Sequence, residues 1–518
     1  MAELTPPKPA ARPLVVDTLA GSVAVLLVVN IIQRSVGFGR GILFCRWLSP
    51  EALGNWEMAY GFLLLAAPLA VLGLPGSFGR YLERYRERGQ LRSFLTRTAI
   101  WSFVLSALTI ATIVVERERF AWLIFGDSRE APLVVWVAVC LALVIVHHFL
   151  EAVFAGLRLF RVVSAMQFCH SMGFAVLALT LLYFWRDAAG SIVVGYGAAC
   201  LLSIVGVLLW SLQRVERTGT IAPPIPHSQF WPSLMRFAIW VWVANLLSNL
   251  FAVVDRYMIV HFSGMSSEVA LAQVGNYHTS NILPMLLVSV ANLLVGAVTP
   301  HLSYDWEQGR REHVSTRLNL VLKLTSLGML AAGVGILVFC PVLFRVAFEN
   351  KYADGLAVLP WALVASVWFS LLLVAQTYVW CAEQTWRAAW PMVWGLLANV
   401  VLNLLWLPKW GLWGAVVATA CATCLALLLQ LVVNRRCGMR ICRGTWLACA
   451  LPLALAAGTI PAALCLALIL LTSLTTNAVL TVEERSALAK LLQRRVNRSR
   501  ELATSASEFQ IPNPQSAI

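Results

Sequence analysis

The chain has 518 residues, of which 59% are hydrophobic and 12% are charged, and its mean hydropathy is +0.76. This composition excludes a water-soluble globular protein of this size and predicts a polytopic membrane protein. The formal net charge of +14 is explained by membrane topology and anionic lipid headgroups, so no nucleic acid partner is expected.

Apolar segments of the roughly 20 residues that a helix needs to cross a bilayer recur along the chain. We expect six spans at 19–43, 51–74, 94–115, 132–152, 162–184 and 190–212, and six more at 233–260, 274–298, 318–340, 356–380, 388–407 and 412–433. Residues 446–480 are too long for one span and short for two. We predict a tight hairpin of two thin spans there, with a re-entrant loop or a single thirteenth span as the alternatives.

The distribution of Lys and Arg predicts the orientation, because most of them fall on one side of the predicted spans and that side faces the cytoplasm. Both termini are then cytoplasmic. The expected parts are a tail 1–18 without a removed signal peptide, an N-lobe 19–213, a cytoplasmic Pro-rich linker 214–232, a C-lobe 233–434, a basic link and short hairpin 435–480, and a basic cytoplasmic tail 481–518.

Short motifs of the first half return in the second half in the same order. The stretch "GNWEMAYGFLLL" from Gly54 returns as "GNYHTSNILPML" from Gly275, and "GSIVVGYGAAC" from Gly190 returns as "GLWGAVVATAC" from Gly411 with the same offset. This predicts an all-α membrane protein with two six-helix lobes related by a pseudo-twofold axis along the membrane normal, plus a C-terminal hairpin. Such an architecture is typical of alternating-access transporters.

Three arginines interrupt the first span. Arg34 is expected deep in the hydrocarbon, Arg40 nearer the outer face, and Arg46 at the interface, where it can extend toward water. Because a charge in the membrane interior is costly, it indicates either a substrate site or an internal salt bridge. The repeat makes Arg34 equivalent to Asp255, so we predict that these two residues face each other as a gate in one conformation, with Arg256 beside them.

Amide side chains occur four residues apart on two spans, Asn245 with Asn249 and Asn399 with Asn403. Residues four apart share a helix face. Such pairs suit sugar hydroxyls in a cavity, but hydrogen bonds between helices are the alternative.

His147, His148 and Glu151 lie near the predicted cytoplasmic end of the fourth span. Their spacing could serve proton coupling or hold a metal ion. A hydrogen-bonded network at the helix end is simpler, and we expect neither a metal nor a cofactor. No protease, phosphate-loop, kinase or nucleophile-elbow pattern occurs, so a transporter is expected rather than an enzyme.

The stretches "CRWLSPEALGNWEMAYGFLLL", "LAVLGLPGSFGRYL", "VVDRYMIVHF" with "VGNYHTSN", and "LPKWGLWGAVVAT" resemble the polysaccharide-transporter branch of the multidrug/oligosaccharidyl-lipid/polysaccharide exporter superfamily. The resemblance implies twelve or fourteen helices in two lobes and a flippase for a lipid-diphosphate-linked oligosaccharide in a bacterial cytoplasmic membrane. It assigns the diphosphate to Arg34 and Arg40, and it implies membrane lipids and a polysaccharide polymerase or export protein as partners.

Three other functions stay open from the sequence. The sequence alone separates a peptidoglycan-precursor lipid flippase poorly from the oligosaccharide flippase that the resemblance implies. A cation-coupled multidrug exporter would favour carboxylates inside the first lobe, and we expect none at mid-span positions between residues 19 and 152. A membrane glycosyltransferase or polymer ligase would need a large outer loop, and all predicted outer loops are short.

Overall fold

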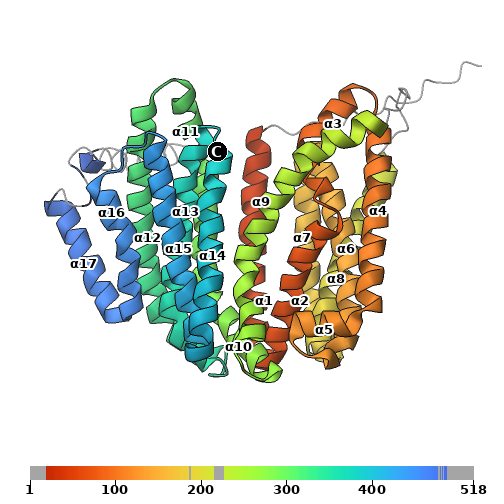
Figure 1. Cartoon of the computed structure of the whole chain (residues 1–518), viewed down its shortest axis with the longest axis horizontal. Helices are drawn as coiled ribbons and strands as arrows, with labels where there is room; N and C mark the ends of the chain where they lie inside the picture. Colours follow the sequence, from red (N-terminus) through yellow and green to blue (C-terminus); the bar gives the residue numbers. More distant parts are fainter. Residues whose placement is uncertain are drawn as a thin grey trace, which may run out of the picture. The chain divides into compact units, whose positions relative to one another are not determined.

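The computed structural model describes residues 19–185, 188–214, 227–476, 479, 481 and 484–486, and it contains helices and no strands over these residues (Figure 1). The long helices are α1 (Leu19–Trp47), α2 (Pro50–Ala70), α4 (Leu91–Val115), α6 (Ala131–Gly156), α7 (Phe160–Phe184), α8 (Ala188–Arg214), α9 (His227–Phe262), α11 (Pro284–Glu307), α12 (Arg311–Val346), α13 (Ala353–Cys381), α14 (Thr385–Trp410) and α15 (Leu412–Arg436). The shorter elements are η1 (Leu74–Ser77), α3 (Phe78–Glu87), α5 (Arg117–Phe125), η2 (Ser128–Glu130), α10 (Ser267–Asn281), α16 (Arg443–Ala450), η3 (Leu451–Ala457) and α17 (Thr459–Thr475).

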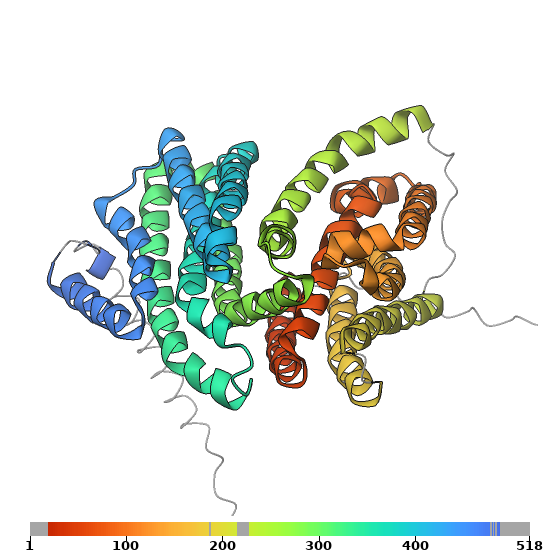
Figure 2. The same ribbon diagram turned by 60° about the horizontal axis from the view of Figure 1, so that its bottom comes forward.

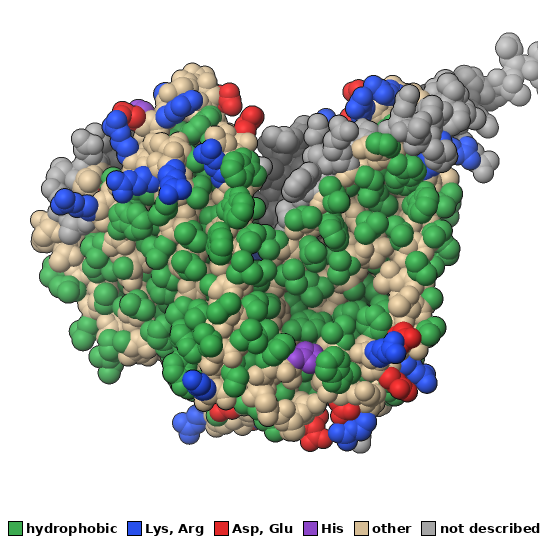
Figure 3. Space-filling view, viewed as in Figure 1, with side chains coloured by type: hydrophobic (Ala, Val, Ile, Leu, Met, Phe, Trp, Pro, Cys, Tyr) green, Lys and Arg blue, Asp and Glu red, His purple; other side chains and the backbone are tan. Residues whose placement is uncertain are grey.

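The protein is an all-α polytopic membrane protein. In the part of the chain that the structure describes, nine helices are long and apolar enough to cross a bilayer, and α1, α2 and α9 are long helices at three further predicted spans. On the face shown in Figure 3, hydrophobic side chains cover the middle of the helices, and most charged side chains gather near their ends. The number of crossings and the lobe boundaries stay predictions.

The predicted span 274–298 is wrong as a single helix. The chain forms α10 up to Asn281 and begins α11 at Pro284. Proline has no backbone N–H to donate to the preceding turn, and it is favoured in the first turn of a new helix. The residues before the break, Gly275 to Asn281, are mostly polar and the apolar residues begin at Ile282, so the predicted span joined the end of one helix to the start of the next.

The chain divides into two compact units. The first unit comprises Met1–Ile282, Cys340–Leu359 and Met392–Ala422, and the second comprises Leu283–Phe339, Pro360–Pro391 and Thr423–Ile518. Within the first unit, α7 packs along α8, α6 packs against α8, α1 packs against α7, and α2 packs against α10.

The two copies of the G-N-aromatic motif meet where α2 packs against α10. A Cβ atom at Gly54 would lie 1.9 Å from the carbonyl oxygen of Leu271, and one at Gly275 would lie 2.1 Å from the carbonyl oxygen of Pro50. Each glycine therefore lets its helix approach the backbone of the other helix, as small residues do in membrane helix pairs. The repeated motif encodes this close crossing.

In the second unit, the predicted hairpin at 446–480 is built from α16, η3 and α17, with a turn at Gly458, whose φ is +95° (Figures 1 and 2). Side chains of neighbouring helices bond its backbone. Asn319 of α12 accepts the amide N–H of Cys442 at 3.3 Å, and Trp368 of α13 donates its indole N–H to the carbonyl of Cys449 at 2.8 Å. Because each helical segment is short, whether the hairpin crosses the bilayer stays a prediction.

Candidate functional site

A buried ion-pair network joins three helices of the first unit. The Glu57 carboxylate on α2 lies 3.0 Å from the Arg256 guanidinium on α9 and 3.0 Å from His278 Nδ1 on α10, and the Glu57 side chain is 5% exposed. Arg256 was among the predicted coupling residues, whereas Glu57 and His278 were missed. Glu57 is thus a buried carboxylate of the first predicted lobe, near the start of the predicted span 51–74 rather than at its middle.

The signal for this network was present in the repeat. Glu57 is the fourth residue of "GNWE" and His278 is the fourth residue of "GNYH". Because the first residues of the two motifs pack backbone to backbone, the fourth residues, one helical turn along, are brought within bonding distance. Equivalent positions of the two halves thus carry opposite charges when His278 is protonated.

Asp255 forms a second buried centre in the first unit, and its carboxylate is 2% exposed. It accepts hydrogen bonds from Tyr277 Oη at 2.7 Å, Thr419 Oγ1 at 2.8 Å, Asn399 Nδ2 at 2.9 Å and Asn403 Nδ2 at 3.1 Å. These donors come from α10, α15 and α14. The structure therefore brings together the predicted residues Asp255, Asn399 and Asn403. It adds Tyr277 and Thr419, which the sequence analysis missed.

The Asp255 centre is rich in oxygen atoms. Asn403 Oδ1 is buried and, within the described residues, has no hydrogen-bond partner. Carboxylate, amide and hydroxyl oxygens are the ligands that hard cations prefer, so these side chains could hold such a cation after the amide donors turn away. The pairing of Asp255 with Arg34 in another conformation stays a prediction.

The other predicted amide pair, Asn245 with Asn249, is not part of this centre. Asn245 is exposed, and Asn249 donates Nδ2 to the carbonyl of Leu64 at 3.0 Å. That bond joins α9 to α2, which is the helix-packing use of an amide.

The three arginines of α1 have three different surroundings. The Arg34 side chain is exposed, and Arg46 is exposed with its Nε 3.5 Å from a Glu349 oxygen. The Arg40 guanidinium lies 4.0 Å from the centre of the Phe174 ring, a distance typical of a cation–π contact. Arg40 also interacts electrostatically with Glu57, which links it to the buried network.

Aromatic rings surround the position of Arg40. Trp56 lies 5.6 Å from Tyr60 and 5.5 Å from Phe174, and Tyr196 lies 4.9 Å from Phe174, measured between ring centres. We call Trp56, Tyr60, Phe174 and Tyr196 the aromatic cluster. It combines flat apolar surfaces with two hydroxyl groups beside a cation, a combination that suits a glycan linked to an anion.

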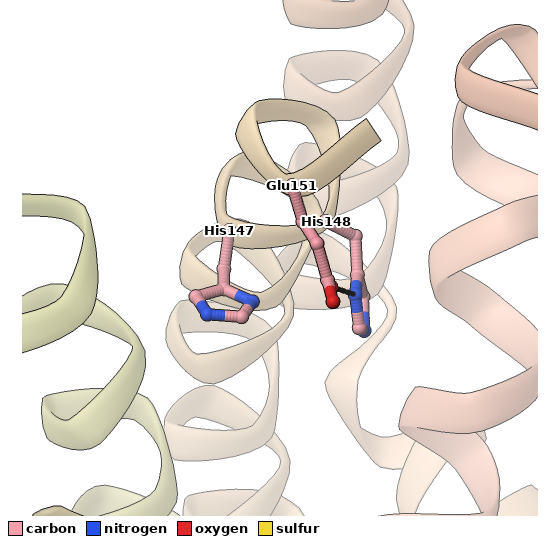
Figure 4. Close-up of side chains that lie close together, drawn as sticks. All are labelled: His147, His148 and Glu151. Atoms are coloured by element: carbon pink, nitrogen blue, oxygen red, sulfur yellow. Dashed lines mark hydrogen bonds and ion pairs between the residues drawn. The ribbon is translucent and has the colours of Figure 1, made fainter. Parts of the chain in front are cut away.

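The predicted histidine cluster on α6 is divided between two networks (Figure 4). His147 is 3% exposed, and its Nε2 lies 3.2 Å from Ser203 Oγ. His148 Nδ1 lies 3.3 Å from a Glu151 oxygen, and Gln167 donates to the other Glu151 oxygen. One candidate ligand atom from each of His147, His148 and Glu151 lies within 4.8 Å of the other two. These groups could hold a metal only after rearranging, because His147 and the His148–Glu151 pair (Figure 4) are held by different hydrogen bonds.

A family model described as "Polysaccharide biosynthesis protein" matches residues 19–304. The chain belongs to this polysaccharide biosynthesis family. The resemblance predicted from the sequence is thereby confirmed, and the matched region includes α1, the Glu57 network and Asp255.

Two relatives match over most of their length. The "Probable low-salt glycan biosynthesis flippase Agl15" of Haloferax volcanii is 21% identical over 405 residues, which cover 78% of this chain and 80% of the relative. The "Uncharacterized membrane protein YabM" of Bacillus subtilis is 22% identical over 409 residues, which cover 76% of each chain.

Solved structures show the same fold. The lipid II flippase MurJ in an inward closed conformation superposes with a TM-score of 0.63 at 14% identity, covering 92% of this chain and 100% of MurJ. An inward-facing multidrug resistance MATE transporter of the MOP superfamily superposes with a TM-score of 0.61 at 16% identity, covering 80% of this chain and 97% of the transporter. This member of the polysaccharide biosynthesis family thus has the fold of MOP superfamily transporters.

Proposed function

We propose that the protein is a flippase that moves a lipid-diphosphate-linked oligosaccharide across the cytoplasmic membrane by alternating access, for export of an exopolysaccharide or O-antigen-type polysaccharide. The family, a relative named as a probable glycan biosynthesis flippase, and the fold shared with a lipid II flippase support this proposal. The proposed activity is transport rather than catalysis.

The observation that carries the proposal is the position of Arg40 beside the aromatic cluster and the Glu57–Arg256–His278 network. Charged groups in a membrane interior are costly and mark substrate or ion pathways. Arginine stays charged at every relevant pH, and its planar fork matches the oxygens of a diphosphate. In this proposal Arg34 and Arg40 hold the diphosphate, and the aromatic cluster contacts the first sugars.

The test uses proteoliposomes that contain a fluorescent polyprenyl-diphosphate oligosaccharide, with translocation measured by a membrane-impermeant reagent that modifies the sugar. Arg34→Lys keeps the charge without the fork and should retain part of the translocation. Arg34→Gln should lose nearly all of it. Because the Arg34 side chain is exposed, both variants should reach the folded abundance of the unmodified protein.

Normal translocation per folded molecule in Arg34→Gln would overturn the role of Arg34. An unmodified protein that leaves the lipid-linked oligosaccharide on one leaflet would overturn the proposed function.

A cation-coupled multidrug exporter is the second candidate, and Glu57 favours it because a buried carboxylate can bind a coupling cation. Its test is uptake of a cationic dye into the same proteoliposomes under a proton or sodium gradient. Dye uptake that Glu57→Gln abolishes per folded molecule, together with no movement of the glycan lipid, would decide for this candidate.

A further inference from the structure

A cavity of about 350 Å³ lies where α2, η2 with α6, and α8 begin, all within the first unit. Its polar lining includes Glu51 and Asn55 of α2 and Arg129 and Glu130 of η2, and Trp136 of α6 forms an aromatic wall. The predicted topology places this end of the helices outside the membrane. None of these residues belongs to the network around Arg40 and Asp255.

Asn55 has hydrogen-bonding capacity that the protein does not use. Its side chain is 7% exposed, and its Oδ1 is buried without a hydrogen-bond partner within the described residues. A buried amide oxygen left unpaired costs free energy comparable to a lost hydrogen bond. The cavity that Asn55 lines is the place from which a ligand or water can supply the missing donor once the amide turns.

The repeat shows how an asparagine at this position is used when the protein itself supplies its hydrogen-bond donor. The equivalent of Asn55 is Asn276, whose Oδ1 accepts the backbone N–H of Gly355 at 3.1 Å, in the first turn of α13. Beside it, Gln273 donates to Asp354 at 2.9 Å. The second half of the sequence thus closes this place with α13, whereas the first half leaves a cavity around Asn55.

The charges of the cavity select against an anion. Glu51 and Glu130 contribute two carboxylates, and the only Arg or Lys among the lining residues is Arg129. The guanidinium of Arg129 is already bound to Asp127, with Nε and one terminal nitrogen each 2.8 Å from Oδ2. A phosphate or diphosphate would therefore meet two carboxylates beside a single cation that is already paired.

The remaining groups fit a sugar ring. Carboxylates and an amide accept and donate the paired hydrogen bonds that neighbouring hydroxyls need, and the Trp136 side chain is 42% exposed, which leaves ring surface for stacking. The volume is at the small end of ligand sites, about 300–1,000 Å³, and so suits a sugar rather than a polyprenyl chain.

We propose that this cavity binds one neutral or amino-substituted sugar residue of the exported glycan on the outer face. The identity of the glycan as the source rests on the proposed function, whereas sugar binding itself does not. The cavity then holds the glycan after translocation and lowers the tendency of the substrate to return.

The binding test is saturation-transfer difference NMR on the full chain in nanodiscs, which avoid sugar-containing detergents. The probes are glucose, galactose, N-acetylglucosamine and glucosamine, added singly. At least one should receive saturation from the protein. Trp136→Ala should weaken its affinity about tenfold, equivalent to roughly 1.4 kcal/mol, and Trp136→Tyr should retain most of the affinity because it keeps an aromatic face.

Two further variants make the result specific. Glu51→Gln, at an exposed position, should weaken binding without affecting the fold. Trp122→Ala is the matched control, because Trp122 is an exposed tryptophan of the same unit that does not line the cavity, and it should leave binding unchanged. Absence of saturation for every sugar, or binding unaffected by both Trp136→Ala and Glu51→Gln, would overturn the site. Displacement of the sugar by pyrophosphate would show that the cavity binds an anion, and it would overturn a sugar as the ligand class of the cavity.

A second measurement identifies the source of the sugar. Excess soluble sugar should slow translocation of the lipid-linked oligosaccharide in proteoliposomes by occupying the cavity. If the protein translocates the lipid-linked oligosaccharide and a bound soluble sugar does not slow it, the exported glycan is not the source. The ligand would then be a free sugar on the outer side. Sugar binding in a protein that translocates no glycan lipid would overturn the proposed function and likewise leave a free sugar as the ligand.

Discussion

Glu57 shows how one carboxylate can connect its own helix to two others. It lies between Arg256 of α9 and His278 of α10, and both partners are at least three-quarters buried. Desolvation makes such a network a poor source of net stability when it is intact, but removing one partner strands the others. The residue is therefore more sensitive to substitution than a packing contact of the same size.

We expect Glu57→Gln to lower the free energy of unfolding by roughly 3–5 kcal/mol, because Arg256 then stays buried without its counter-charge. The measurement is folded abundance and thermal stability by fluorescence-detected size-exclusion chromatography. Glu51→Gln, exposed on the same helix, is the control and should change little. The double variant Glu57→Gln/Arg256→Gln should recover much of the loss; if it is no better than Glu57→Gln, the stranded charge is not the cause.

At the scale of helices, the α2–α10 crossing depends on two glycines. We expect Gly54→Ala and Gly275→Ala each to destabilise the protein by about 1–3 kcal/mol, because the added Cβ meets backbone rather than a movable side chain. Gly328→Ala in α12 is the control, since nothing lies within 4 Å of its added Cβ, and it should stabilise slightly, by up to about 1 kcal/mol. Equal thermal shifts in the three variants would contradict the close crossing.

The segment that follows α17 is held to α12 by a buried ion pair. Lys323 is 1% exposed, and its Nζ lies 2.9 Å from both oxygens of Glu484, which also accepts the backbone N–H of Thr481 at 2.8 Å. The reciprocal bond from Glu484 N–H to the Thr481 hydroxyl makes this a capping box. Thr481 and Glu484 are thereby held by charge as well as by the local capping bonds.

Glu484→Gln should lower the thermal stability of the protein by an amount that corresponds to roughly 3–5 kcal/mol, because the buried Lys323 then loses the carboxylate that pairs with it. Glu312→Gln provides the comparison. That residue pairs with Arg440 in the same unit, but both side chains are largely exposed, and such pairs contribute about 0–1 kcal/mol. An equal effect of the two substitutions would refute the buried character of the Lys323 pair.

At the scale of the whole molecule, hydropathy predicted the long helices because lipid imposes one requirement on every span. The break at Pro284 escaped because the predicted span joined the polar last turns of α10 to the apolar first turns of α11. The repeat indicated which helices are equivalent, but it did not reveal that Glu57 and His278 bond, since that requires the crossing of α2 with α10. Asp255 was recognised as a charge in a span, whereas Tyr277 and Thr419 are ordinary residues that only the three-dimensional arrangement brings to it.

Orientation is the remaining property of the whole chain, and the distribution of basic residues predicts it. Reporter fusions after Arg88, Arg217, Arg311 and Arg436 should report the cytoplasm, and those after Gly126, Asp187 and Asp354 should report the outside. A tag after Arg500 should be cytoplasmic, because its neighbourhood is basic; an outside signal there would mean an odd number of crossings. Gly126 is the decisive position, because it precedes the Asp127–Arg129 pair at the sugar cavity. A cytoplasmic signal at Gly126 would contradict the predicted set of spans and would place that cavity on the side from which the glycan is loaded.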